Sequence, residues 1–346
     1  MLSNKDIVLV VDYHEKNMEI RRLNCDTGEE RTFNEPTTRQ NILRLVEEVF
    51  VEATAQGGQA VWIMESMTGW ARVKELVQEK AKFLVCNVLQ MPRAPKAKRR
   101  KTDKLDTGRT LREYLTGTLP FSFQPQPKLR RLRRLTGLRE NLTSRQTALK
   151  NWIGRYLAHE TWQDRQNLWT RAGTERLKRW AADSVDAFVL SIKLEELSQV
   201  EVLLDRTEEE ILKVHARWPL AQCVDEIRGI GAVSAVSILA RIGPVERFAN
   251  VEQLVSFAGL APGVRQSDRT VRTGHLGGGG TDMHLRYYLV EASIWARQIP
   301  RYSKAYERVA RKRGAKVGRL TVARMLLRSI YKMIRGGIRF NQLPAA

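Results

Sequence analysis

Two uninterrupted apolar runs stand out in the N-terminal third of the chain. Residues 7–11 are β-branched or leucine and end at Asp12, and residues 60–64 are apolar and end at Glu65. Apolar runs without polar alternation are typical of strands that are buried on both faces of a sheet. The sequence therefore predicts two central strands, each with a carboxylate at its end.

Shorter patterns predict the other elements of this third. We expect strands at residues 18–23, 30–33 and 82–89, and helices at residues 37–55 and 70–80. A turn signal, Asp26 to Gly28, separates the second and third strands. With a last helix at the acidic segment near residue 103, this order resembles the layout of the ribonuclease H-like fold, to which RuvC-like domains belong.

The rest of the chain has helical periodicity. From Lys128 onward leucines recur at helical spacing, and a second predicted helix, residues 185–217, carries a seven-residue apolar series. The members of this series are Leu190, Leu197, Leu204, Ile211 and Trp218, with Leu194 between them and Glu201 at a seam position. Such heptads predict a coiled coil, formed either with the first helix or with a second copy of the chain.

Three prolines within residues 120–127 predict a linker. We therefore expect an α/β domain at 1–119, a helical coiled-coil region at 120–220 and a helical domain at 221–346. The fold class is α/β plus all-α.

Charge narrows the classes of partner. Among 346 residues, 59 are Lys or Arg and 38 are Asp or Glu, so the net charge is +21, while 42% of the residues are hydrophobic. A folded protein with this charge is expected to bind nucleic acid, and an anionic membrane surface is the weaker alternative. We expect no signal peptide and no membrane span, and the three scattered cysteines suit a reducing cytoplasm.

Candidate chemistry centres on four carboxylates. Asp103 and Asp106 are three residues apart and would share one helix face, and Asp12 and Glu65 end the two central strands. Hard cations such as Mg²⁺ prefer carboxylate oxygens, and two such ions can activate a phosphodiester. The alternative is that Asp12 and Glu65 are ordinary carboxylates at strand ends. Asp103 and Asp106 would then be stabilised by the positive N-terminal end of the helix dipole. A basic run directly precedes the pair and suits a polyanionic substrate: Lys98, Arg99, Arg100 and Lys101.

Two further segments are candidates for phosphate contact. The first predicted long helix is dense in arginine at Arg130, Arg131, Arg133 and Arg134. Gly229 and Gly231 have the spacing of a helix-hairpin-helix turn, in which the backbone approaches a phosphate closely. For the arginine-rich helix, the alternative is a spacer with a solvated charged face. For Gly229 and Gly231, the alternative is a tight helix–helix turn.

A basic loop is predicted after Pro262. It contains Arg265, Ser267 and Arg269, and on composition alone its single serine would be a loop hydrogen-bonding residue.

Several of these segments together resemble one family. The residues are Val11-Asp12, Met64-Glu65-Ser66, the segment from Lys101 to Asp106, and Gly259 to Pro262 followed by Ser267 and a helix with Leu285-Arg286. They are similar to insertion-sequence transposases with an N-terminal RuvC-like DEDD domain and a C-terminal serine domain, also described as bridge-RNA-guided recombinases. The family commonly has two serines and two glycines where this chain has Gln266-Ser267-Asp268-Arg269.

This resemblance implies a DNA transposase that excises and inserts its element. It implies Mg²⁺ on Asp12, Glu65, Asp103 and Asp106, and Ser267 as a nucleophile that forms a phosphoserine link to DNA in a composite site with the carboxylates. The implied partners are a noncoding bridge RNA, donor and target double-stranded DNA, and further copies of the chain in a homo-oligomer, a dimer of dimers. The location would be cytoplasmic, nucleoid-associated, in a bacterium or archaeon. A metal-only RuvC-type junction nuclease and a non-enzymatic RNA- or DNA-binding protein remain alternatives.

Overall fold

The structure is a computed structural model that describes residues 3–67, 69–91, 103–159, 167–182, 188–261, 263–267, 270–274 and 281–343. The chain forms two compact units, Met1–Gln124 and Pro125–Ala346. The division into three domains stays a prediction. Within the described residues no helix is both long and apolar enough to cross a membrane.

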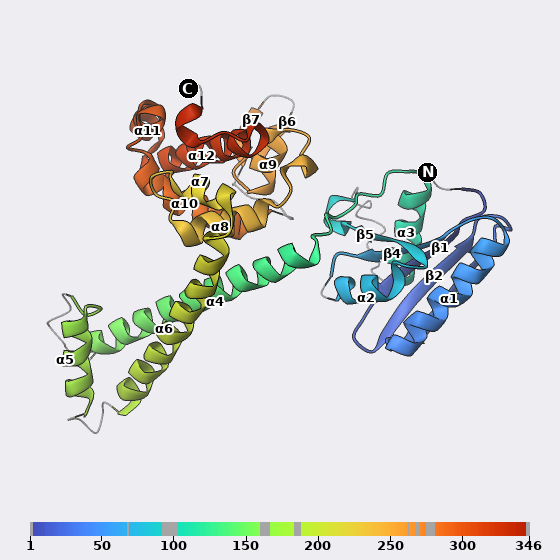
Figure 1. Cartoon of the computed structure of the whole chain (residues 1–346), viewed down its shortest axis with the longest axis horizontal. Helices are drawn as coiled ribbons and strands as arrows, with labels where there is room; N and C mark the ends of the chain where they lie inside the picture. The colour runs from blue at the N-terminus through green and yellow to red at the C-terminus, as the bar shows by residue number, and fades with distance from the viewer. Residues whose placement is uncertain are drawn as a thin grey trace. The chain divides into compact units, whose positions relative to one another are not determined.

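A mixed five-stranded sheet with the order β3-β2-β1-β4-β5 forms the centre of the first unit (Figure 1). Its strands are β1 (Ile7–Tyr13), β2 (Asn17–Asn24), β3 (Glu30–Pro36), β4 (Ala60–Glu65) and β5 (Ala81–Cys86). β2 is antiparallel to both β1 and β3, whereas β1, β4 and β5 are parallel. Parallel strands need helical crossovers, and the predicted helices supply them.

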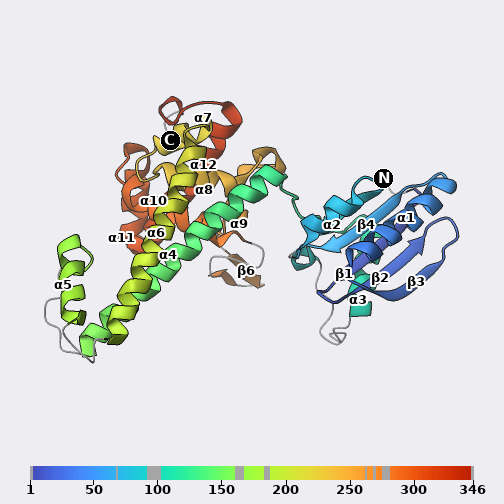
Figure 2. The same ribbon diagram turned by 60° about the horizontal axis from the view of Figure 1, so that its bottom comes forward.

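Helices cover both faces of this sheet. α1 (Arg39–Ala55) and α2 (Trp70–Val77) lie on one face and α3 (Asp103–Leu115) lies on the other (Figure 2). Successive side chains of a strand point to opposite faces, so Leu9 packs in the core with α1 and Val8 packs in the core with α3. Burial on both faces explains why β1 and β4 have continuous apolar sequences.

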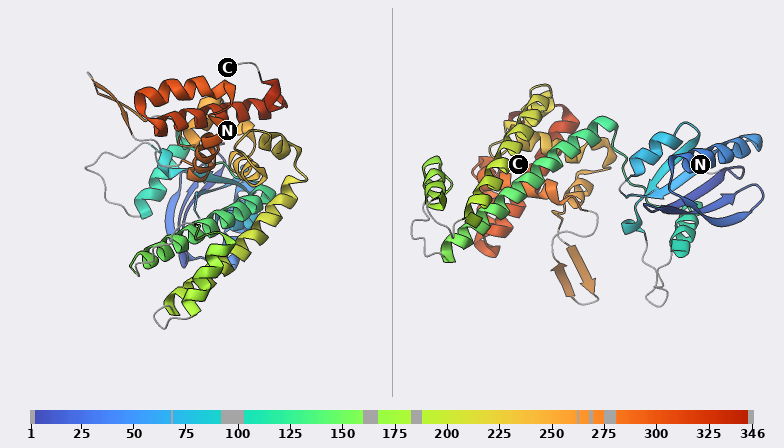
Figure 3. Two further views of the ribbon diagram at one scale, coloured as in Figure 1. Left: turned by 90° about the vertical axis from the view of Figure 1, so that its left-hand side faces the viewer. Right: turned by 90° about the horizontal axis from the view of Figure 1, so that it is seen from below.

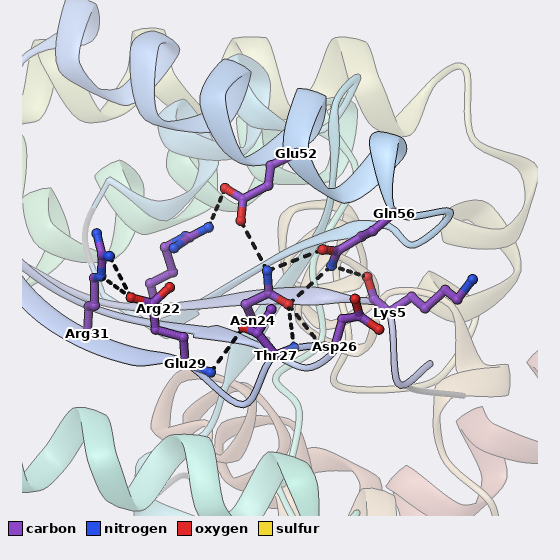
Figure 4. Close-up of polar contacts among 9 residues, drawn as sticks. All are labelled: Lys5, Arg22, Asn24, Asp26, Thr27, Glu29, Arg31, Glu52 and Gln56. Carbon is purple, nitrogen blue, oxygen red and sulfur yellow. Dashed lines mark hydrogen bonds and ion pairs between the residues drawn. The ribbon is translucent and has the colours of Figure 1, made fainter.

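Asn24 holds the turn between β2 and β3, and it is buried (Figure 4). Its Oδ1 accepts hydrogen bonds from the backbone N–H groups of Asp26 (3.0 Å) and Thr27 (3.3 Å). Its Nδ2 donates to Glu52 (3.1 Å) and Gln56 (3.2 Å) of α1. The predicted turn is thus present, and one asparagine ties it to the helix.

The edge of the sheet at β5 differs from the prediction. The strand ends at Cys86, and a 3₁₀ turn, η1 (Val88–Gln90), replaces the expected continuation. The backbone N–H of Ser122 donates to the carbonyl of Val85 at 2.8 Å. The stretch expected to be a linker therefore begins as a segment that pairs with the edge of the sheet, which satisfies backbone groups that an open edge would expose.

The residues of the second unit that the structure describes form helices and one hairpin. Its elements are α4 (Pro127–His159), α5 (Arg171–Ala182), α6 (Phe188–His215), α7 (Pro219–Asp225), α8 (Ala232–Ile242), η4 (Val245–Arg247), α9 (Val251–Phe257), β6 (Gly263–Ser267), β7 (Thr270–Gly274), α10 (Met283–Ala296), α11 (Pro300–Arg313), α12 (Ala315–Gly336) and η5 (Phe340–Gln342). Figure 3 shows β6 and β7 as a ribbon that extends from the surrounding helices.

The long helices α4 and α6 lie side by side within one chain. Leu149 and Ile153 of α4 share a core with Leu190 and Leu197 of α6, and α5 closes the end of this pair. Glu201, the expected irregularity of the seam, lies 3.0 Å from Nζ of Lys150. Residues of α7, α8, α9, α10 and α12 form a second hydrophobic core in this unit.

Candidate active site

The carboxyl ends of β1 and β4 bring two of the predicted acids together. The strands are parallel, and Val11 pairs with Met64, so the next positions along each strand are Asp12 and Glu65. Strand alternation places both side chains on the sheet face that α3 covers. The side chain of Asp12 is 17% exposed, and its Oδ2 lies 3.3 Å from Nε2 of His14.

α3 adds the third carboxylate. A small cavity of about 10 Å³ lies between the strand ends and this helix. It is lined by Val10, Val11, Asp12, Met64, Glu65, Cys86, Asp106, Thr107 and Thr110. A space of this size holds about one water molecule. Three of the four predicted acids therefore line one cavity.

The fourth predicted acid, Asp103, begins α3 and lies one turn before Asp106. Its side chain lies outside the described part of the structure, as do Lys98, Arg99, Arg100 and Lys101. Their roles stay predictions.

Three carboxylates from two strand ends and a helix form a set of oxygen donors that fits a hard cation such as Mg²⁺. Among the side chains that the structure describes, no group of three or more His, Cys, Asp or Glu is placed so that it could hold a metal ion. The three carboxylates therefore share one cavity but do not by themselves form a metal site in the structure.

Cys86 lies at the same cavity and is fully buried. Burial raises the pKa of its thiol to about 12, and the charge of Glu65 adds to the rise. The thiol is therefore neutral at physiological pH and is a weak nucleophile.

The sequence reasoning missed a further acid, Glu19. It pairs with Asp12 across β1 and β2 and is 9% exposed. The hydroxyl of Thr107 donates to its Oε1 at 3.4 Å. Only the antiparallel register shows that Glu19 lies beside Asp12. The alternation of Met18, Glu19 and Ile20 does place Glu19 on the sheet face opposite to Met18 and Ile20.

The expectation of a basic loop around Ser267 is wrong. Residues 263–267 and 270–274 form an antiparallel hairpin, in which Ser267 pairs with Thr270. The β-branched residues Val264, Thr270 and Val271 favour strands, which the basic composition concealed. The side chains of Arg265 and Ser267 lie outside the described part, as does Arg269.

The described residues at the two ends of this hairpin segment are tied to each other. The backbone N–H of Asp282 donates to the carbonyl of Phe257 at 2.7 Å. Oδ1 of Asp282 then caps α10 by accepting from the N–H of Leu285 at 2.9 Å. The segment that carries Ser267 thus leaves the helical core and returns to it at one place.

The four predicted phosphate-binding arginines of α4 differ in their surroundings. Arg131 and Arg134 are exposed, and Arg130 is half-buried. Arg133 donates from Nε to the carbonyl of Ala240 and from Nη2 to the carbonyl of Arg241, both at 2.8 Å. It therefore satisfies backbone carbonyls at the C-terminus of α8.

The two glycines of the turn before α8 are both exposed but differ in the space around them. Gly229 has φ +96°, and a Cβ there would lie 2.5 Å from the carbonyl oxygen of Ala292. Gly231 is exposed, and no heavy atom lies within 4 Å of the place that its Cβ would occupy. Only Gly229 is required by the packing of the turn.

A buried carboxylate joins three helices close to this region. Oε2 of Glu140 in α4 accepts from Nη2 of Arg241 in α8 at 2.8 Å and lies 2.7 Å from Nδ1 of His284 in α10. The side chain of Glu140 is 8% exposed, whereas that of His284 is 54% exposed. No sequence pattern predicts this contact, because Glu140 lies more than a hundred residues before both of its partners.

Two family models match the chain. A DEDD transposase model of the IS110 type, described as "Transposase", matches residues 11–160, which include all four predicted acids. A model described as "Transposase IS116/IS110/IS902 family" matches residues 221–308, which include the glycine turn and Ser267. Together they cover more than half of the chain. Curated proteins give no match.

Proposed function

Since the chain belongs to the IS110/IS116/IS902 family of insertion-sequence transposases, we propose that it excises and inserts a mobile DNA element under the guidance of a noncoding bridge RNA. The RNA would pair with donor and target double-stranded DNA, so base pairing would select the sequence and the protein would supply the chemistry. The family implies DNA binding, strand transfer and the use of a divalent metal.

The arrangement of Asp12, Glu65 and Asp106 around one cavity is the observation that carries this proposal. With Asp103 one turn earlier on α3, these residues would hold Mg²⁺. Bound there, the metal would polarise a phosphodiester and stabilise its leaving oxygen. Two of the four carboxylates come from the sheet and two from α3. Their positions would determine where the negative charge of the phosphodiester is neutralised.

Ser267 is the proposed nucleophile, and it would act with the carboxylates on the same phosphodiester. Its Oγ would form a bond to phosphorus as the bond from phosphorus to the leaving sugar oxygen breaks. The hydroxyl proton would pass to a base, and the leaving oxygen would take up a proton. The resulting phosphoserine ester keeps the bond energy for the rejoining step, in which a DNA hydroxyl displaces the serine.

The surface charge supports the proposed partners. A net charge of +21 suits simultaneous contact with an RNA and two DNA duplexes. Arg131 and Arg134 are exposed on α4 and are available for phosphate contact. Exchange of four strands between two duplexes requires several active sites, and we propose a dimer of dimers.

A trapping experiment tests this function. Purified protein, its flanking transcript and end-labelled donor and target duplexes are mixed with Mg²⁺, quenched and run on a denaturing gel. Wild-type protein should give a slowly migrating, protease-sensitive species, which Ser267→Ala and Asp106→Ala should both lack. RNase-treated protein should give it only after the transcript is restored.

Three outcomes would contradict parts of the proposal. Cleavage by Ser267→Ala without an adduct would favour a metal-only nuclease. Recombination by RNA-free protein would exclude guidance. Binding of RNA and DNA without any strand cleavage would favour a non-enzymatic role.

A further inference from the structure

Helix α3 is fixed to the sheet by polar contacts with β2. Glu19 and Arg21 lie on the strand face that α3 covers. Nε of Arg21 donates to Oγ1 of Thr107 at 3.4 Å, and the hydroxyl of Thr107 donates to Glu19. Thr107 is 2% exposed, so the chain of contacts lies within the protein.

Gly108 allows Arg21 to approach the backbone of α3. A Cβ at this position would lie 3.0 Å from Cζ and 3.1 Å from Nη2 of Arg21. Glycine inside a helix is less favourable than alanine by about 1 kcal/mol, so helix propensity does not explain the glycine at this position. Nη1 of Arg21 also forms an ion pair with Glu30 of β3, which is a further contact of the guanidinium.

These contacts are adjacent to the carboxylate that α3 contributes. Thr107 and Gly108 directly follow Asp106, and Thr107 lines the same cavity. A small rotation or shift of α3 would therefore move Asp106 relative to Asp12 and Glu65. Metal sites tolerate displacements of only about 0.2 Å in their ligands, and groups that orient the ligands typically change metal affinity by about 10- to 100-fold.

We propose that Arg21 and Thr107, with Glu19 and the space left by Gly108, are positioning residues for the carboxylate site. We name these four residues the β2–α3 latch. The latch holds the first turns of α3 so that Asp106 faces the ends of β1 and β4, and it does not itself contact the metal or the DNA. This inference rests on the proposed metal-dependent function.

Metal binding is measured directly, on full-length protein freed of RNA, by titration with Mn²⁺ and electron paramagnetic resonance. Asp106→Ala sets the level of binding outside the site. Thr107→Val keeps the shape of the side chain and removes its hydroxyl, and it should weaken Mn²⁺ binding roughly 10-fold. Thr107→Ser restores the hydroxyl and should bind within about twofold of wild type.

Gly108→Ala tests the steric part of the latch, and Gly154→Ala is its matched control. Gly154 is also a helix-interior glycine, in α4, but no atom lies within 4 Å of its Cβ position. Gly108→Ala should weaken Mn²⁺ binding several-fold, whereas Gly154→Ala should leave it unchanged. Because the clash is with Arg21, Gly108→Ala should have no further effect in protein that already carries Arg21→Ala.

Circular dichroism should show folded protein for every variant. The latch is refuted if Thr107→Val binds Mn²⁺ as tightly as wild type, or if Gly108→Ala and Arg21→Ala weaken binding additively. If wild type binds no more Mn²⁺ than Asp106→Ala does, the metal site itself is absent, and the proposed function and the latch are both overturned. Site-specific binding that is equal in wild type and all latch variants overturns the latch alone.

Discussion

Gly229 and Gly231 provide a matched pair of substitutions that separates the folding role of the turn before α8 from its proposed contact with phosphate. At Gly229 an alanine would have φ +96°, and its Cβ would meet a backbone oxygen at 2.5 Å. At Gly231 the φ value is −91°, which any residue adopts, and the space for a Cβ is open.

The expected cost of Gly229→Ala follows from these two features. A non-glycine residue at positive φ costs about 1–2 kcal/mol, and the backbone shift that relieves an overpacked contact costs about 1–3 kcal/mol. The free energy of unfolding of the second unit should therefore fall by about 2–5 kcal/mol. For a unit of this size the melting temperature should drop by about 5–15 °C.

Gly231→Ala should behave differently. It replaces glycine at the N-cap of α8, which costs no more than about 1 kcal/mol, so the melting temperature should change by a few degrees at most. If the backbone of this turn contacts a phosphate, the new methyl group blocks the approach. Loss of one charge-assisted hydrogen bond, about 1.5 kcal/mol, would weaken nucleic-acid binding about 10-fold.

Differential scanning calorimetry gives the stability, and equilibrium binding of labelled RNA and duplex DNA gives the affinity. A melting temperature equal to that of wild type for Gly229→Ala would show that the turn does not pack against α10 as described. Unchanged affinity for Gly231→Ala across a range of salt concentrations would remove the turn from the nucleic-acid interface.

Three other predictions concern the two units. Asp12→Ala and Asp106→Ala should abolish recombination while circular dichroism stays that of folded protein, because removing one of several like charges relieves repulsion; recombination at the wild-type rate by either variant would contradict a role for that carboxylate. Arg133→Ala should lower the free energy of unfolding by about 1.5–3 kcal/mol, because it removes a charged donor from the carbonyls of Ala240 and Arg241, of which that of Arg241 keeps a bond from Nη2 of Arg247 at 3.3 Å. Arg134→Ala should leave stability unchanged and reduce the salt dependence of RNA binding; thermal melts and a salt series distinguish the two. Cys86 should resist alkylation by iodoacetamide at pH 8, because its pKa of about 12 leaves almost no thiolate; mass spectrometry of native protein should find modification at this position only after unfolding.

The sequence predicted the elements whose signal is local. β4 extends only one residue, Glu65, beyond its apolar run, and β1 extends beyond its run by Asp12 and Tyr13. Asp12 and Glu65 were placed at neighbouring strand ends because parallel strands in this order share one edge. For α6, the helix ends at His215, two residues before the predicted end, since periodicity does not mark where a helix ends.

What the sequence could not predict depends on contacts between distant segments. Arg133 looks like its neighbours in the sequence, and only the position of α8 shows that it satisfies two carbonyls. Glu19 and Gly108 acquire meaning from the register of β2 and the position of α3. The hairpin around Ser267 has no clear strand pattern in the sequence, because arginines and polar residues interrupt its few β-branched residues, and such a basic composition predicts a loop.

The hydrogen bond between the N–H of Asp282 and the carbonyl of Phe257 has a consequence for how this protein can be altered. Both ends of the intervening segment are anchored at one point of the helical core, so its length is decoupled from the stability of that core. Doubling the length of a loop with fixed ends costs only about 0.6 kcal/mol in closure entropy. Segments of other lengths, or from other members of the family, could therefore be grafted between residues 261 and 281, and the reach of the serine becomes a quantity that protein engineering can vary while α9 and α10 stay as they are.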